Sequence, residues 1–92
     1  MGVDCSIIIG KKETSLDRWY VFCQVFPSGK FYPKNIFLAK LKDLINKPFL
    51  GEENYCSYWI NEAQKLAEKA NDDEKIAIIN EHDLCHDLSI PN

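Results

Sequence analysis

The chain has 92 residues, of which 46% are hydrophobic and 27% are charged, and its formal net charge is -3. These values lie in the ordinary range for globular proteins, and the length predicts a single domain over residues 1–92. A domain this small has little spare stability for a deep, strained active-site cleft, so the composition favours surface binding over catalysis. No run approaches the roughly 20 apolar residues of a membrane span, and Met1 to Asp4 lacks the basic start of a secretion signal. We therefore expect a cytoplasmic protein that does not bind membranes.

The first third of the chain carries strand patterns. Val3 to Ile9 alternates in the manner of a strand, and the polar residues 11–15 are expected to end it. Arg18 to Phe26 is rich in aromatic and β-branched residues, which predicts a second strand. Residues 27–30 have turn chemistry, so Phe31 and Tyr32 are expected to return as a short third strand.

The middle of the chain carries helix patterns. Apolar residues recur at helical spacing over Lys34 to Asn46 and again from Asn54 to Ala70, separated by a connection that contains Pro48 and Gly51. The apolar stripe expected on the second helix consists of Trp59, Ile60, Ala63, Leu66, Ala67 and Ala70.

Residues 75–81 are ambiguous between strand and helix. Asn71 and Glu74 could form a capping box that opens a third helix, whereas the β-branched run from Ile76 to Ile79 favours a strand. With the strand, the order is β-β-β-α-α-β, which predicts an α+β fold: a small, mostly antiparallel sheet with two helices packed on one face. Residues 87–92 are expected to form a loose tail.

The four cysteines are scattered at Cys5, Cys23, Cys56 and Cys85 without paired spacing, which predicts reduced thiols. The densest group of potential metal ligands is His82, Cys85 and His86, which would share one face of a helix. A structural zinc site usually has four ligands, so the sequence favours a polar C-terminal segment over a metal site. We expect no cofactor, and zinc remains an alternative.

The predicted second strand supplies the candidate binding surface. If Trp19, Val21 and Cys23 face the helices, Tyr20, Phe22 and Phe26 face the other way and form an open aromatic face. Cations and rings nearby extend it, which suits an acidic protein or nucleic acid. The predicted binding residues are Arg18, Tyr20, Phe22, Phe26, Lys30, Tyr32 and Lys34. The alternative is that both faces of the sheet are covered.

Charge is unevenly divided along the chain. Residues 1–47 contain eight basic and four acidic residues, and residues 48–92 contain three basic and ten acidic residues. The asymmetry suggests a bipolar surface that steers a partner towards the basic half.

No catalytic constellation is complete, because the chain has no glycine-rich phosphate loop and no nucleophile with a positioned base. In general style, a short chain with a dense core and many surface charges resembles the small accessory proteins of phages and mobile elements, many of which inhibit a larger complex. We expect a non-enzymatic binding protein for a protein or ribonucleoprotein partner. Nucleic-acid binding through the aromatic and basic face is the first alternative, and the sequence leaves a homodimer open.

Overall fold

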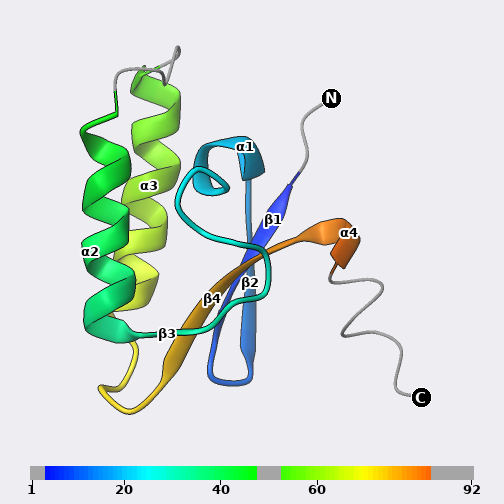
Figure 1. Ribbon diagram of the computed structural model, residues 1–92, viewed down its shortest axis with the longest axis vertical. Coiled ribbons are helices and arrows are strands. Elements are labelled where there is room, and N and C mark those ends of the chain that lie inside the picture. The colour runs from blue at the N-terminus through cyan, green and yellow to red at the C-terminus, as the bar shows by residue number, and fades with distance from the viewer. Residues whose placement is uncertain (1–3, 48–52, 84–92) are drawn as a thin grey trace.

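The computed structural model describes residues 4–47 and 53–83, which form a four-stranded antiparallel sheet with two main helices packed against it (Figure 1). The strand order across the sheet is β2-β1-β4-β3, so the predicted α+β fold is confirmed. The elements in chain order are β1 (Cys5–Ile9), β2 (Lys12–Leu16), α1 (Trp19–Phe22), β3 (Tyr32–Pro33), α2 (Lys34–Ile45), α3 (Glu53–Glu68), β4 (Lys75–Asn80) and α4 (Glu81–Asp83). No helix among these residues is long and apolar enough to cross a bilayer.

The two central strands, β1 and β4, are apolar on both faces. Ile7 pairs with Ile78 on the face towards the helices, and both side chains are buried in the main core. On the opposite face Ile8 pairs with Ala77, and these side chains are also buried. The alternative of a sheet covered on both faces therefore holds at its centre.

The first strand is followed by a polar strand that folds back on it as a hairpin. Residues 11–15 were expected to end that strand, but Lys12–Leu16 forms β2, which pairs with β1 along its whole length. Gly10 has a φ of 61° and Lys11 does not have a positive φ, which is the pattern of a two-residue type II′ turn with glycine first. The polar composition of β2 fits its place at an edge, where one side of the strand faces solvent.

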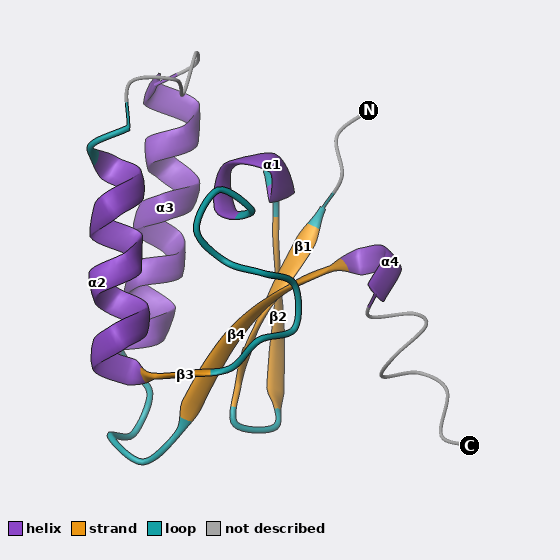
Figure 2. Cartoon of the chain, viewed as in Figure 1, coloured by secondary structure: helices purple, strands orange, loops and turns teal. Residues whose placement is uncertain are grey.

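The prediction of a strand over Arg18 to Phe26 is wrong, because the segment starts with a helical turn. The Arg18 N–H donates to Asp17 Oδ1 at 2.7 Å, and Arg18 adopts the left-handed conformation with a φ of 66°, which turns the chain out of β2. The Cys23 and Phe26 amides then donate to carbonyls four residues earlier. Figure 2 shows the rest of the connection crossing to β3 without regular structure.

The two main helices lie side by side and bury their apolar stripes. In α2 the buried residues are Phe37, Leu41 and Leu44, as the spacing predicts. In α3 the stripe is narrower than expected, because Ile60 and the alanines are buried while Trp59 and Leu66 are only partly buried at its margins.

Residues 75–80 form a central strand, so the strand prediction for this segment is confirmed. One of the two capping-box contacts forms, although no helix follows it. The Asn71 N–H donates to Glu74 Oε1 at 2.9 Å, whereas the Glu74 N–H donates to the Asn71 backbone carbonyl at 3.0 Å and not to the Asn71 side chain. Together these bonds close a turn that leads into β4. The expected loose tail at 87–92 lies outside the described residues.

Candidate functional site

The open aromatic face expected from the sequence is not present. Phe22 and Phe26 are completely buried, and Tyr32 is only 7% exposed. The Phe26 ring stacks on Phe37 with centroids 4.6 Å apart and meets Tyr32 edge-on at 6.0 Å. These rings belong to the core, and the reason is the helical turn: Phe22 and Phe26 are four residues apart, so they share a face that points inwards.

Lys34, predicted as a binding cation, makes hydrogen bonds and an ion pair within the fold. Its Nζ donates to the carbonyls of Glu68 and Ala70 at 3.0 and 2.9 Å, and it lies 3.8 Å from a carboxylate oxygen of Asp72. The Glu68 carbonyl is at the C-terminal end of α3, where the helix dipole favours a cation, and the Ala70 carbonyl lies in the turn that follows. Lys34 therefore fastens the start of α2 to the end of α3.

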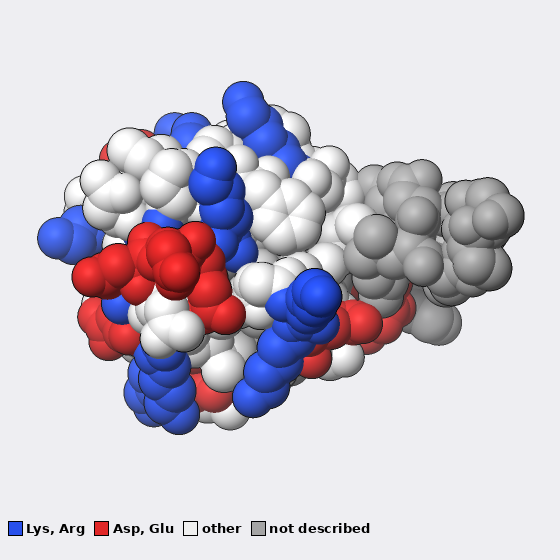
Figure 3. Space-filling view, turned by 90° about the horizontal axis from the view of Figure 1, so that it is seen from below, with Lys and Arg blue, Asp and Glu red and all other residues white. Residues whose placement is uncertain are grey.

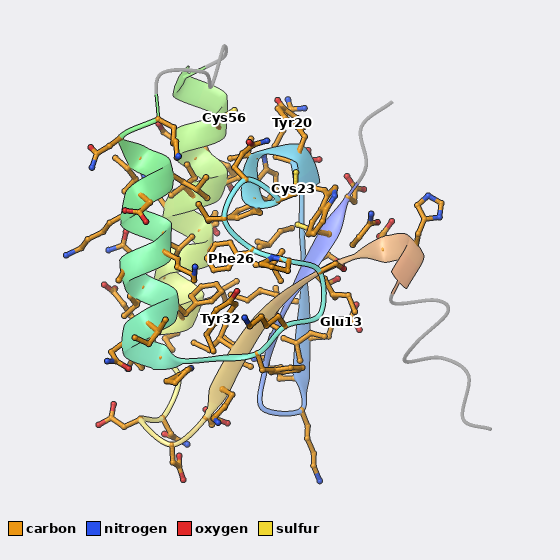
Figure 4. The ribbon with its side chains drawn as sticks, viewed as in Figure 1. Glu13, Tyr20, Cys23, Phe26, Tyr32 and Cys56 are labelled. Atoms are coloured by element: carbon orange, nitrogen blue, oxygen red, sulfur yellow. The ribbon has the colours of Figure 1, made fainter. Side chains whose placement is uncertain are left out.

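Arg18 and Tyr20 form a separate group beside α1. The Arg18 guanidinium lies 5.9 Å from the centroid of the Tyr20 ring, and the Tyr20 hydroxyl lies 3.9 Å from Cys56 Sγ on α3. Tyr20 is 45% exposed. Figure 4 shows Tyr20 and Tyr32 well apart, so the predicted residues do not form one continuous surface.

Two lysines converge on Tyr32. The Nζ atoms of Lys30 and Lys40 lie 5.4 and 5.2 Å from the centroid of its ring, both within the range of a cation–π contact. Phe31, the neighbouring residue, is 45% exposed. We refer to Lys30, Phe31, Tyr32 and Lys40 as the Tyr32 surface. It combines two cations and an exposed ring, a set suited to a carboxylate beside an apolar side chain.

Comparison of the chain with protein-family models, with curated proteins and with solved structures found no match. The site is therefore interpreted from its own geometry.

Sequence reasoning missed Lys40. Its position on the outer side of the first predicted helix gave no sign of a contact with Tyr32, which lies eight residues earlier on a strand. The available signal was the shortness of the connection: Pro33 separates Tyr32 from α2, so the first turns of the helix must stay close to the strand. That closeness brings Lys40 to the ring.

A small cleft lies on another side of the molecule, between the β1–β2 hairpin and the end of α3. It has a volume of about 160 Å³, and Ile9, Leu66 and Ala70 form its apolar lining. The polar residues that line it are Lys12, Thr14, Lys69 and Glu74. Small-molecule sites are usually about 300–1,000 Å³, so this cleft has room for a side chain rather than for a cofactor. We refer to it as the hairpin cleft.

Three of the four cysteines lie among the described residues. Burial raises the pKa of Cys5 to about 12, and its Sγ donates to the Asp17 carbonyl at 3.7 Å. Cys23 is exposed and donates to the Tyr20 carbonyl, and Cys56 is buried. All three are free thiols, and the raised pKa of Cys5 disfavours the thiolate form that a nucleophile needs.

The proposed zinc ligands can be followed only in part. His82 lies on α4, where its backbone N–H donates to Asn80 Oδ1 at 3.0 Å, and its side chain is exposed. Cys85 and His86 lie outside the described residues. Within residues 4–47 and 53–83, no group of three metal-ligating side chains comes together.

The two charged halves of the chain interleave in space. β4, from the acidic half, lies between β1 and β3 of the basic half, and Lys34 reaches Asp72 across the same division. In the view from below, acidic side chains gather with lysines around them (Figure 3). This face of the molecule is therefore mixed in charge.

Proposed function

We propose that the chain is a non-enzymatic binding protein that binds an acidic segment of a protein or ribonucleoprotein at the Tyr32 surface. The observation that carries the proposal is the approach of two ammonium groups, those of Lys30 and Lys40, to one aromatic ring that follows the exposed Phe31 in the chain. An acidic residue next to an apolar one in the partner would meet a cation and a ring at the same time.

The surface is prepared for binding. Tyr32 is held by its contact with Phe26, which in turn stacks on Phe37, so the ring does not have to be ordered when a partner arrives. The contacts of Lys30 and Lys40 with the Tyr32 ring also restrict the conformations of these two side chains before a partner binds. Immobilising a flexible side chain costs about 0.5–1.5 kcal/mol, so this restriction lowers the free-energy cost of association.

A protein ligand fits this surface better than a nucleic acid does. Single-stranded nucleic acids bind by stacking successive bases on several exposed rings, but of the four predicted rings only Tyr20 is exposed. The net charge of -3 also opposes a phosphate backbone. Nucleic-acid binding through Arg18, Tyr20 and Lys30 is the second candidate, and a steep fall of affinity with salt would favour it.

The remaining parts of the proposal rest on the sequence alone. They are the cytoplasmic location and the action on a larger complex in the manner of a phage-type inhibitor or accessory factor. The geometry of the described residues adds no support to inhibition, and the zinc alternative depends on residues outside them.

A site-specific crosslinker tests the proposal. Benzoylphenylalanine in place of Phe31 is expected to capture a protein partner in extracts of the native source. The matched control places it at Tyr58 on α3, which is exposed to a similar degree, 52% against 45%. Capture from position 31 and not from position 58, abolished by combining Lys30→Glu with Lys40→Glu, supports the Tyr32 surface.

Two outcomes contradict it. Equal capture from both positions would show that the label reacts without a docking surface. A captured species that nuclease degrades, with no protein left attached, would transfer the proposal to nucleic acid. Circular dichroism of each variant confirms that the fold is retained.

A further inference from the structure

The outer edge of β2 offers backbone hydrogen-bonding groups in a defined pattern. The Gly10 N–H donates to the Lys75 carbonyl and the Glu81 N–H donates to the Asp4 carbonyl, so even-numbered residues along β1 direct their backbone towards β4. Because the two sides of a strand alternate, odd-numbered residues of β1 bond to β2. Their partners on β2 are Lys12, Thr14 and Leu16.

The N–H and C=O groups of Glu13 and Ser15 therefore point away from β1. Among the described residues, β2 has β1 as its only strand neighbour, so these four groups face the open edge. An open edge is a template for an added strand, which gains affinity from main-chain hydrogen bonds and specificity from pockets for alternate side chains.

The hairpin cleft lies on the side of the sheet where alternate side chains of an added strand would project. Ile9 pairs with Lys12, and Ile7 pairs with Thr14, so Lys12 and Thr14 share the helix-facing side of β2. Both residues line the cleft together with Leu66 of α3. A residue placed across from Thr14 would direct its side chain over this apolar lining.

The charges around the cleft favour an acidic ligand. Lys12 and Lys69 are exposed at its margin. One acid, Glu74, also lines the cleft, and its Oε1 accepts the Asn71 N–H. Glu13 lies on the opposite face of the sheet, where its Oε2 accepts the Ser6 hydroxyl at 2.9 Å. Two lysines against one carboxylate leave the lining of the cleft with a net positive charge.

We propose that the β2 edge binds an extended acidic peptide of a protein partner as a fifth, antiparallel strand. The peptide's apolar side chain lies across from Thr14 and enters the hairpin cleft. An acidic side chain two residues later lies across from Lys12 and within reach of Lys69. The recognised pattern is thus apolar, any residue, acidic. This site is distinct from the Tyr32 surface, and neither proposal depends on the other.

The probe is a blocked seven-residue peptide that reads threonine, valine, threonine, leucine, threonine, glutamate, threonine. In the proposed register leucine faces Thr14 and glutamate faces Lys12. Amide hydrogen exchange of the full chain is measured by NMR with and without it. In the free protein the Glu13 and Ser15 amides should exchange fast and the Thr14 amide slowly. At about 90% occupancy of the site by the peptide, the exchange of the Glu13 and Ser15 amides should slow about tenfold, because exchange then proceeds from the remaining free protein.

Matched variants separate the backbone contact from the charge contact. Ser15→Pro removes an outward N–H that β1 does not use, and proline is tolerated on such an edge, so binding should be lost while the fold persists. Ser15→Ala keeps the N–H and should bind as the wild type does. Lys12→Glu and Lys69→Glu should each weaken binding about tenfold, since an attraction to the peptide glutamate becomes a repulsion, and Lys42→Glu should leave binding unchanged.

Three results would overturn the proposal. The first is equal binding of a control peptide in which leucine and glutamate are exchanged. The second is peptide binding that leaves the Glu13 and Ser15 amides in fast exchange. The third is protection of these amides that rises with protein concentration alone, which would assign the edge to a second copy of the chain.

Discussion

The contact of Lys34 with the end of α3 gives a stability prediction that also tests the fold. Lys34 opens α2, where a cation opposes the positive end of the helix dipole, so its presence there is unfavourable locally. The compensation is its pair of hydrogen bonds to the Glu68 and Ala70 carbonyls at 3.0 and 2.9 Å. Substitution by methionine keeps most of the apolar stem and removes the charge and both bonds.

The magnitude follows from the geometry. A cation at a partly buried helix C-terminus contributes up to about 2 kcal/mol, and the Lys34 side chain is 22% exposed, so water can replace part of the loss. The ion pair adds little, because Asp72 is fully exposed. We expect Lys34→Met to cost about 1.5–2 kcal/mol, which for a domain of this size lowers the Tm by roughly 6–16 °C.

Thermal unfolding followed by circular dichroism, with urea unfolding as a check, measures this effect. Lys42→Met is the matched control, since Lys42 is an exposed lysine on the same helix, and it should change stability by less than about 0.5 kcal/mol. Equal losses in the two variants would refute the role of Lys34 as the link between the helices.

Three further outcomes are expected. Phe22→Ala should cost about 3–5 kcal/mol and leave little folded protein in a urea titration, because the ring is completely buried. In the native protein at pH 8, iodoacetamide should modify Cys23 and spare Cys5, whose pKa burial raises to about 12; mass spectrometry identifies the modified thiol. The hydrogen bond with Asp17 raises the pKa of Asp4 above 3.8, so this carboxyl stabilises the fold at low pH and loses that contribution as the pH rises through its folded-state pKa. Asp4→Asn should therefore raise the Tm at pH 7, and the gain should shrink below pH 3.8; a gain constant across this range would exclude the effect.

The fold class could be predicted because the strongest patterns belong to the elements that build the core. In β1, β4 and α2, burial of apolar side chains in the core determines the secondary structure. The apolar runs and the helical spacing of these segments therefore predict their conformation. β2 could not be predicted in this way. Its polar residues have no apolar alternation, and pairing with β1 through a two-residue turn determines its conformation.

The strand prediction for the segment after β2 was wrong for a different reason. Its aromatic and β-branched residues have high strand propensity, and tertiary packing overrides that weak preference. Trp19, Phe22 and Phe26 also fit helical spacing, which was the signal available in the sequence. The predicted binding surface depended on this strand assignment, and two of its rings, Phe22 and Phe26, lie in the core instead. The contact of Lys40 with Tyr32 could be found only from the tertiary structure.

The most direct test of the central claim is the affinity of the crosslinked partner for two double variants that change the net charge equally. Isothermal titration calorimetry compares Lys30→Glu/Lys40→Glu with Lys11→Glu/Lys42→Glu. If the Tyr32 surface binds an acidic segment, the first pair should weaken binding about a hundredfold, since two attractions become repulsions worth roughly 1–2 kcal/mol each, and the second less than threefold. Similar losses in both variants would show that overall charge, and not the Tyr32 surface, determines binding.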